Sequence, residues 1–168
     1  PIVREMLRGA LAATVGPMAA VAGAIAQAVG QKLKAEGSGA IVENGGDCYL
    51  DVTEDVTMAV YAGPRSPFTN RLGLRFSAAD FPLGVCTSSG TIGHSLSFGR
   101  ADAVTVVAPN AALADAAATR LGNVVQDPAT IGAALELAAE IPGLTAVLIL
   151  VNDRLGAWGN LELLPLDG

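Results

Sequence analysis

The sequence is poor in the residue types that most often mark a partner surface. Charged residues make up 15% of the 168 residues and aromatic residues only 4%, and the formal net charge is −6. No block of Lys or Arg is present, and nucleic acids and anionic membrane surfaces both need a basic footprint on the protein. The composition therefore argues against both of these partners.

Cysteine and histidine are scarce as well. The two cysteines, Cys48 and Cys86, fit neither a disulfide framework nor a zinc ligand set. A reducing, cytoplasmic compartment is the simpler expectation, and a single bridge stays open as the alternative. Because His94 is the single histidine, any imidazole chemistry has to come from it.

One long uncharged run resembles a signal peptide or a membrane span. Residues 9–31 carry no charge, and Arg4 and Arg8 precede them. The run consists mostly of Ala and Gly, which insert weakly into bilayers, and Gly16-Pro17 interrupts it, so we expect a soluble protein. The chain begins with Pro1 rather than Met, which leaves open that an N-terminal part with any targeting signal is missing.

The order of apolar segments and turn residues predicts one α+β domain over residues 1–168. We expect a mixed or antiparallel sheet packed against Ala/Gly-rich helices. The predicted helices cover residues 1–13, 17–35, 111–123 and 127–139. The predicted strands cover residues 40–43, 48–52, 56–62, 72–76, 85–88, 103–108, 144–151 and 161–164. Residues 53–55 are expected to be a hairpin tip, 72–76 an edge strand and 153–160 a turn.

A polar stretch between two apolar strands is the first candidate site. Its hydroxyls and backbone N–H groups could cradle a phosphate, although P-loop spacing and the P-loop lysine are missing; the residues are Thr87, Ser88, Ser89, Gly90 and Thr91. His94 follows as a candidate catalytic base, a phosphate contact or a structural histidine. Cys86 with His94 leaves a thiol nucleophile open as a weaker alternative, because no third orienting residue is visible.

Asp115 and Thr119 form the second candidate. They lie four residues apart on a helix that is otherwise nearly all alanine, so both point to the same side. Asp is unfavourable inside a helix, and a carboxylate with a hydroxyl on one face suits a hard cation such as Mg²⁺. The alternative is that Asp115 faces solvent or pairs with a nearby Arg.

The third candidate is the turn formed by Asn44, Gly45, Gly46 and Asp47. Two glycines allow the backbone to approach a ligand closely, and an ordinary hairpin turn is the other interpretation. Polar groups in so apolar a chain must share a solvent-accessible site or be hydrogen-bonded. We therefore expect residues 45–47, residues 87–94, Asp115 and Thr119 to meet in one cleft.

The blocks GPMAAVAGAIAQAVG, IVENGGDCY, CTSSGTIGHSLSFGRADAV and ADAAAT occur in this order over nearly the whole chain. Together they resemble an uncharacterised bacterial and archaeal family of the ApbE-like superfamily, whose members usually carry an additional N-terminal segment. ApbE proteins bind FAD, use Mg²⁺ and attach FMN through a phosphoester to a threonine of a partner protein. The resemblance implies that Asp115 and Thr119 hold the metal. It also implies that the flavin nucleotide contacts Gly45, Gly46 and Asp47, with Thr87, Ser89, Gly90 and His94 matching the family's T-S-G segment and histidine.

The sequence also departs from that pattern. Ser95 to Phe98 stand where the transferases have an IIDP-type segment, and the lysine of their glycine-rich helix has no equivalent here. Two functions are therefore expected as alternatives: a flavin transferase that uses FAD or FMN with Mg²⁺ and a protein acceptor, or a non-catalytic ligand-binding module. In both, the partner is a small-molecule nucleotide, with no nucleic acid and no membrane, and a homo-oligomer is left open.

Overall fold

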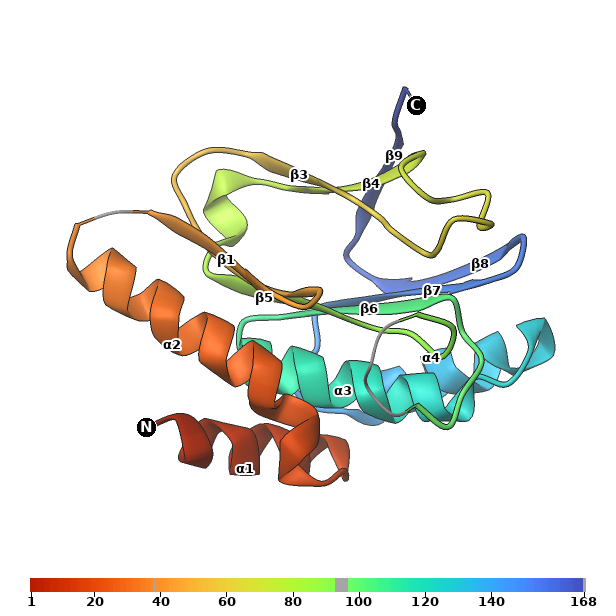
Figure 1. The fold of residues 1–168 in the computed structure, drawn as a ribbon, viewed down its shortest axis with the longest axis horizontal. Coiled ribbons are helices and arrows are strands. Elements are labelled where there is room, and N and C mark those ends of the chain that lie inside the picture. The colour runs from red at the N-terminus through yellow and green to blue at the C-terminus, as the bar shows by residue number, and fades with distance from the viewer. Residues whose placement is uncertain (38, 93–96, 168) are drawn as a thin grey trace.

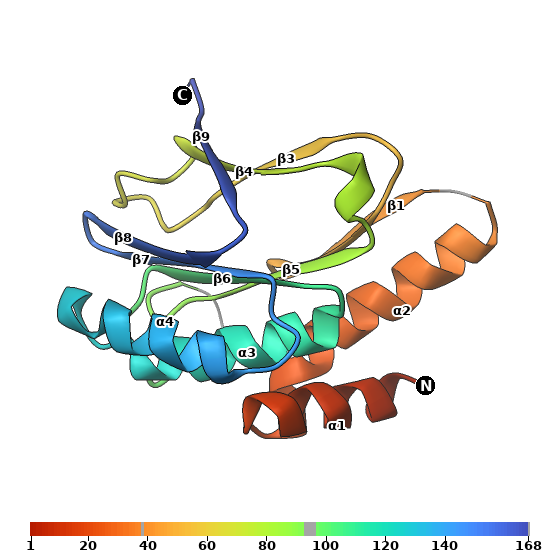
Figure 2. The same ribbon diagram turned by 180° about the vertical axis from the view of Figure 1, so that it is seen from behind.

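The elements lie in three layers (Figure 1). The structure is a computed structural model that describes residues 1–37, 39–92 and 97–167. A small sheet lies over one face of a larger sheet, and the helices cover the other face of the larger sheet (Figures 1 and 2). This confirms the predicted α+β fold with antiparallel strands.

The helices begin and end close to where the sequence places them. They are α1 (Ile2–Ala13), α2 (Val21–Ala35), α3 (Ala111–Val124) and α4 (Ile131–Glu140). Short 3₁₀ turns at Pro17–Ala20 and Pro128–Thr130 lead into α2 and α4. Asn110 caps α3, because its side-chain oxygen accepts the Leu113 N–H at 2.9 Å.

The larger sheet carries the main part of the core. In the described residues its strands are β1 (Ala40–Asn44), β2 (Asp47–Asp51), β5 (Leu83–Ser88), β6 (Ala103–Ala108), β7 (Ala146–Val151) and β8 (Arg154–Gly159), in the order β1-β2-β5-β6-β7-β8. Every residue of β6 and β7 is buried. This agrees with their continuously apolar sequences, since both faces of these strands are covered.

The observed strands correct three predictions. The smaller sheet consists of β3 (Val56–Ala59), β4 (Leu72–Phe76) and β9 (Glu162–Pro165), and β4 lies between the other two rather than at an edge. Residues 53–55 are not a hairpin tip, because β2 pairs with β1 and β5 whereas β3 pairs with β4. Residues 154–159 are not a turn but form β8, which pairs with β7 in the larger sheet, and the last strand, β9, pairs with β4. Alternating apolar residues indicate a strand but do not specify which sheet receives it.

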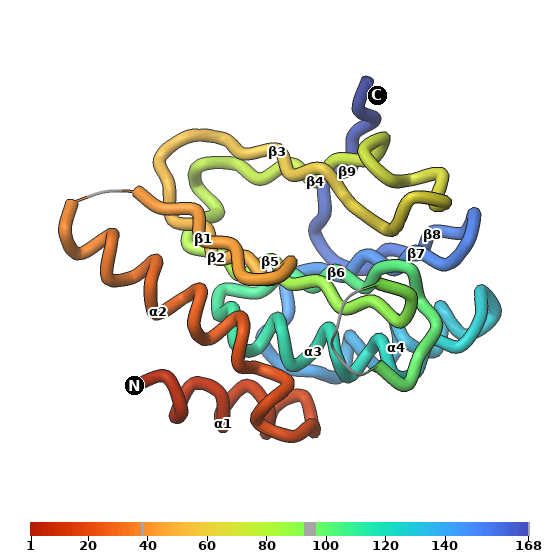
Figure 3. The backbone as a smooth tube through the Cα atoms, in the orientation of Figure 1, coloured from red at the N-terminus to blue at the C-terminus, as the bar shows by residue number. Residues whose placement is uncertain are grey.

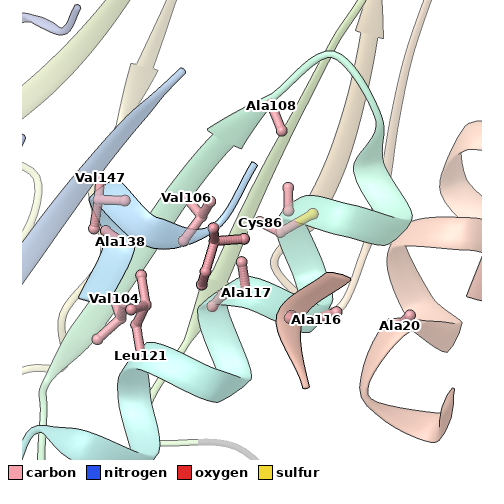
Figure 4. Packing of buried hydrophobic residues seen from close by; sticks show 14 of the residues in the cluster. Ala20, Cys86, Val104, Val106, Ala108, Ala116, Ala117, Leu121, Ala138 and Val147 are labelled. Carbon is pink, nitrogen blue, oxygen red and sulfur yellow. The ribbon is translucent and has the colours of Figure 1, made fainter. Parts of the chain in front are cut away.

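Two hydrophobic cores separate the layers. The core between the larger sheet and the helices is built mainly of Ala and Val, and it includes Cys86 (Figure 4). The core between the two sheets includes Cys48. Both cysteines are free and buried, so the single bridge left open above does not form.

Small residues allow the helices to approach one another closely. A Cβ atom on Gly9 would meet the Ala112 carbonyl of α3, and one on Gly23 would meet the Ala111 carbonyl and the Asp115 Cβ. Each of these contacts brings the backbones of two helices together. The Ala/Gly-rich composition of residues 9–31 therefore reflects packing of α1 and α2 against α3.

The uncharged run is divided between two helices that meet at a sharp bend (Figure 3). Among the described residues, no single helix is long and apolar enough to cross a membrane. Ile2–Ala13 and Pro17–Ala35 reach that length and composition only as a pair, and the chain bends by 109° between them.

Replacing Gly23 with Ala is expected to lower the free energy of unfolding by about 1–3 kcal/mol, because the new methyl group has no space between α2 and α3. Gly132 provides the matched control, since it lies in α4 and a Cβ there meets open space. Gly132→Ala should raise stability by up to about 1 kcal/mol through helix propensity. Denaturant unfolding measures both, and equal effects of the two substitutions would contradict the close packing of α2.

Candidate functional site

A cavity of about 770 Å³ lies at the tip of the β1–β2 hairpin, a size within the range typical of ligand pockets. Three of the predicted groups line it: the Gly45–Asp47 turn, the first part of the 87–94 segment, and the Asp115/Thr119 pair. The structure thus brings together residues that are distant in sequence. The lining residues are Glu43, Gly45, Gly46, Asp47, Met58, Ala59, Val60, Tyr61, Leu74, Val85, Thr87, Ser88, Ser89, Ile92, Thr105, Asp115 and Thr119.

The cavity reaches both faces of the larger sheet. Asp47 pairs with Cys86, and Thr87 pairs with Thr105, in successive positions of the ladder. Because successive side chains on a strand alternate between faces, Asp47 is on the helix side and Thr87 is on the small-sheet side. β5 continues past the hairpin tip to Ser88, so the cavity wraps around that tip.

The hairpin turn requires its two glycines. Gly45 and Gly46 have φ values of +66° and +100°, the positive values that a tight two-residue hairpin turn needs at both central positions. The ordinary-turn interpretation is therefore correct for the backbone, and the turn also lines the cavity. The Asn44 side chain donates to the Ala22 carbonyl at 3.3 Å, which ties the hairpin to the start of α2.

Asp115 caps a helix other than its own. Its Oδ2 accepts the Gly23 N–H at 2.9 Å, in the first turn of α2. Ala20, at the N-cap of α2, has no side-chain oxygen to do this, and a carboxylate at this position also interacts favourably with the helix dipole. The expectation that Asp115 faces solvent or pairs with Arg is therefore wrong.

Two carboxyl groups in this cavity resist ionisation. Burial, and then the negative charge of Asp115, raise the pKa of Asp47 to about 7, although the Cys86 thiol and the Thr87 N–H oppose the shift. Burial raises the pKa of Asp115 to about 6, and the N–H groups of Gly23 and Ala22 oppose it. Both side chains are only 9% exposed. Among the described lining residues there is no Lys or Arg to compensate these charges.

The hydroxyls of the polar stretch are largely occupied by internal hydrogen bonds. Ser89 Oγ accepts the N–H groups of Thr91 and Ile92 at 3.1 and 3.0 Å, and the Gly90 N–H donates to the Ala101 carbonyl at 2.8 Å. These three backbone N–H groups already have partners within the protein, and the phosphate cradle stays a prediction. Of the five predicted residues, Thr87, Ser88 and Ser89 line the cavity, whereas Gly90 and Thr91 do not.

The structure tests Cys86, the candidate nucleophile, but not His94, the candidate base. His94 lies outside the described residues. Cys86 is fully buried, its thiol donates to the Ala111 carbonyl at 3.4 Å, and burial raises its pKa well above the usual value. A thiol that is shielded from solvent and stays protonated is a poor nucleophile. This argues against the cysteine-dependent alternative.

Sequence reasoning missed Thr105 and the apolar side of the cavity. Thr105 is buried, and its hydroxyl lies 2.8 Å from that of Thr87. The signal for Thr105 was a lone hydroxyl in the apolar run AVTVVA. The apolar side comes from Met58, Val60 and Leu74 on the small sheet, which no local pattern could have placed here.

A metal ion would find two carboxylates and one hydroxyl here. The described residues contain no group of three or more His, Cys, Asp or Glu side chains placed to hold a metal ion. Mg²⁺ does not need such a group, because it usually keeps several waters and binds through one or two carboxylates and substrate phosphates. Asp47, Asp115 and Thr119 fit that requirement.

Comparison with known proteins assigns the family. The family model described as AbpE bacteria matches residues 1–149. The chain belongs to this family. It is 44% identical over 161 residues to a UPF0280 protein of Methanocella arvoryzae, which covers 95% of this chain and 65% of that protein. It is also 44% identical over 172 residues to a UPF0280 protein of Methanocaldococcus jannaschii, covering 99% and 69%.

These matches correct the resemblance drawn from the sequence blocks. The matching family has its own name and its relatives carry the name UPF0280 protein, so the assignment to the ApbE-like superfamily of flavin transferases is wrong. The chain spans about two thirds of the length of these two relatives. The description of the cavity and its lining residues comes from the structure and is unaffected by this correction.

The raised pKa values predict a decrease in stability between pH 4 and pH 7. Asp47 and Asp115 keep their protons in the folded state up to about pH 7 and 6, whereas the unfolded chain releases them near 3.8. Their contribution is fully present below pH 4 and is lost as the pH rises to 7; at about 1.4 kcal/mol per pH unit, the loss amounts to several kcal/mol. Urea unfolding across this pH range should show the decrease.

Asp47→Asn should flatten that pH dependence, and the exposed Asp153→Asn should leave it unchanged. A parent protein whose stability rises from pH 4 to 7, or an unchanged profile in Asp47→Asn, would contradict the assigned shifts.

Proposed function

We propose that the cavity binds a small nucleotide whose phosphate is held through Mg²⁺ by Asp47, Asp115 and Thr119. FAD and FMN are the first ligands to consider. The observation that carries the proposal is the pair of buried carboxyl groups that line one cavity, where burial disfavours the ionisation of both and the charge of Asp115 further disfavours that of Asp47. A cation bound between two such carboxyl groups stabilises their ionised form.

The charges of the cavity make a metal ion necessary for an anionic ligand. Its described lining contains the acidic residues Glu43, Asp47 and Asp115 and no basic residue. A phosphate would be repelled by these carboxylates, whereas Mg²⁺ attracts both. Asp115 Oδ2 accepts the Gly23 N–H, and the two oxygens of a carboxylate have lone pairs enough to accept such a bond and bind a cation at the same time.

The opposite side of the cavity suits a flat apolar group. Met58, Val60 and Leu74 come from β3, the segment after it, and β4, and Val85 and Ile92 add to them. Tyr61 also lines the cavity and is half exposed, a suitable position for stacking on a ring. An apolar side facing a carboxylate-and-hydroxyl side matches a ligand with a ring at one end and phosphate at the other.

Binding is the role that these residues support best. Transfer of a flavin phosphoester to a protein acceptor would be a further step at the same site, and a binding module without that chemistry is the alternative. Asp47, Asp115 and Thr119 would orient the phosphate in either case. The transfer step would also need a proton acceptor, the role predicted for His94.

Titration calorimetry with FAD and FMN, each with and without Mg²⁺, tests the proposal. We expect binding that needs Mg²⁺, and at least tenfold weaker binding in Asp47→Asn and Thr119→Val, because each loses a metal ligand. Asp115→Asn should weaken binding similarly while staying folded, since the amide oxygen can still accept the Gly23 N–H. The exposed Glu136→Gln on α4 is the control and should bind as the parent does.

Two results would overturn the proposal in different ways. Binding that is indifferent to both Mg²⁺ and Asp47→Asn would remove the metal and keep the cavity as a ligand site. No binding of either nucleotide by folded protein would remove the flavin nucleotides from the proposal.

A further inference from the structure

Exposed apolar side chains are concentrated in the first two helices. Among the described residues, twelve large apolar side chains are exposed, and eight of them lie within residues 1–35. Val3, Leu7 and Leu11 follow the spacing i, i+4, i+8 and form one stripe along α1. Leu11 is 80% exposed and Met18, just beyond α1, is 71% exposed.

This stripe faces away from the rest of the molecule. Met6, Gly9, Ala10 and Ala13 are the buried residues of α1 and pack toward α3. In both ribbon views α1 lies on the outer side of the helix layer, the side opposite the two sheets (Figures 1 and 2). Exposed apolar stripes of this kind mark interaction surfaces.

Charge is distributed unevenly between this segment and the rest of the chain. Residues 1–35 contain four Lys or Arg and one Glu, whereas residues 36–168 contain six Lys or Arg and fifteen Asp or Glu. On α1, Arg4 and Arg8 are exposed next to the apolar stripe. Glu5 accepts from the Arg8 side chain at 3.0 Å and from the Asn110 side chain of α3 at 3.1 Å.

We propose that the outer face of α1, formed by Val3, Leu7 and Leu11 with Arg4 and Arg8, docks on an anionic lipid bilayer. A helix with an apolar stripe and flanking arginines lies in the plane of a membrane interface, with its apolar side chains at the headgroup boundary. The arginines are attracted to anionic headgroups, and the acidic remainder of the protein is repelled from them. The protein therefore approaches the bilayer with this face.

The same charges disfavour a second copy of the chain as the occupant. In a two-fold interface the same patch meets itself, so Arg4 and Arg8 of both copies would come together. The one acidic side chain of α1, Glu5, is already engaged with Arg8 and Asn110. An anionic surface complements this face, whereas a copy of it does not. The overall charge of −6, which argued against membranes at the level of the whole chain, conceals this difference.

Vesicle co-sedimentation of the chain tests the proposal. We expect binding to vesicles of phosphatidylcholine with phosphatidylserine, much weaker binding to phosphatidylcholine alone, and loss of binding when salt rises from about 0.1 M to about 1 M, where charges are screened. Arg4→Gln with Arg8→Gln should weaken binding at least about tenfold. Leu7→Glu with Leu11→Glu should abolish it.

Phe98→Glu is the matched control, because Phe98 is 72% exposed but lies outside α1. It should bind vesicles as the parent does. Circular dichroism verifies that each variant is folded, and the arginine variants, which keep the apolar stripe, still test the proposal if the Leu7/Leu11 variant does not fold. No binding to anionic vesicles at low salt, or equal binding by the variants and the parent, would overturn the proposal. A dimer in sedimentation velocity that Leu11→Glu dissociates would also overturn it, in favour of a second copy.

Discussion

The hydrogen bond from the Gly23 N–H to the Asp115 carboxylate holds the helical layer to the site. It joins the first turn of α2 to the middle of α3 and fixes the position of the carboxyl group that lines the cavity. The bond is short because Gly23 has no side chain to separate the helices. One pair of residues thus links helix capping, helix packing and the charge of the cavity.

The cavity is assembled at the cost of some stability. Buried carboxyl groups that resist ionisation destabilise the folded protein at neutral pH, and a chain selected for stability alone would replace them with apolar residues. Asp115 is held in place by the Gly23 N–H of α2 despite this cost, and the Cys86 thiol and the Thr87 N–H lower the pKa of Asp47 without offsetting its burial. Strained or poorly compensated groups that persist inside a packed protein are typical of functional sites.

The local elements could be predicted from the sequence, whereas their pairing in space could not. Pro17, Asn110 and Pro128 mark helix starts, and the continuously apolar β6 and β7 are recognisable as buried strands. The division into two sheets escaped prediction, because the alternation in β3 and β9 would suit either sheet. β8 escaped as well, since its sequence RLGAWG contains three residues, two Gly and one Ala, that are uncommon in strands. At the site, lone polar residues in apolar segments indicated Asp115 and Thr119, but only the fold shows that Asp115 caps α2.

The positions of the two cysteines allow the opening of each interface of the larger sheet to be measured separately. Cys48 and Cys86 lie on neighbouring strands, β2 and β5, but belong to the cores on opposite faces of the larger sheet. A thiol reagent reaches Cys48 only when the small sheet lifts from the large one, and it reaches Cys86 only when α3 moves away. Local opening of each layer has its own free energy. The labelling rates of the two thiols therefore report independently on the stability of the two interfaces that enclose the larger sheet.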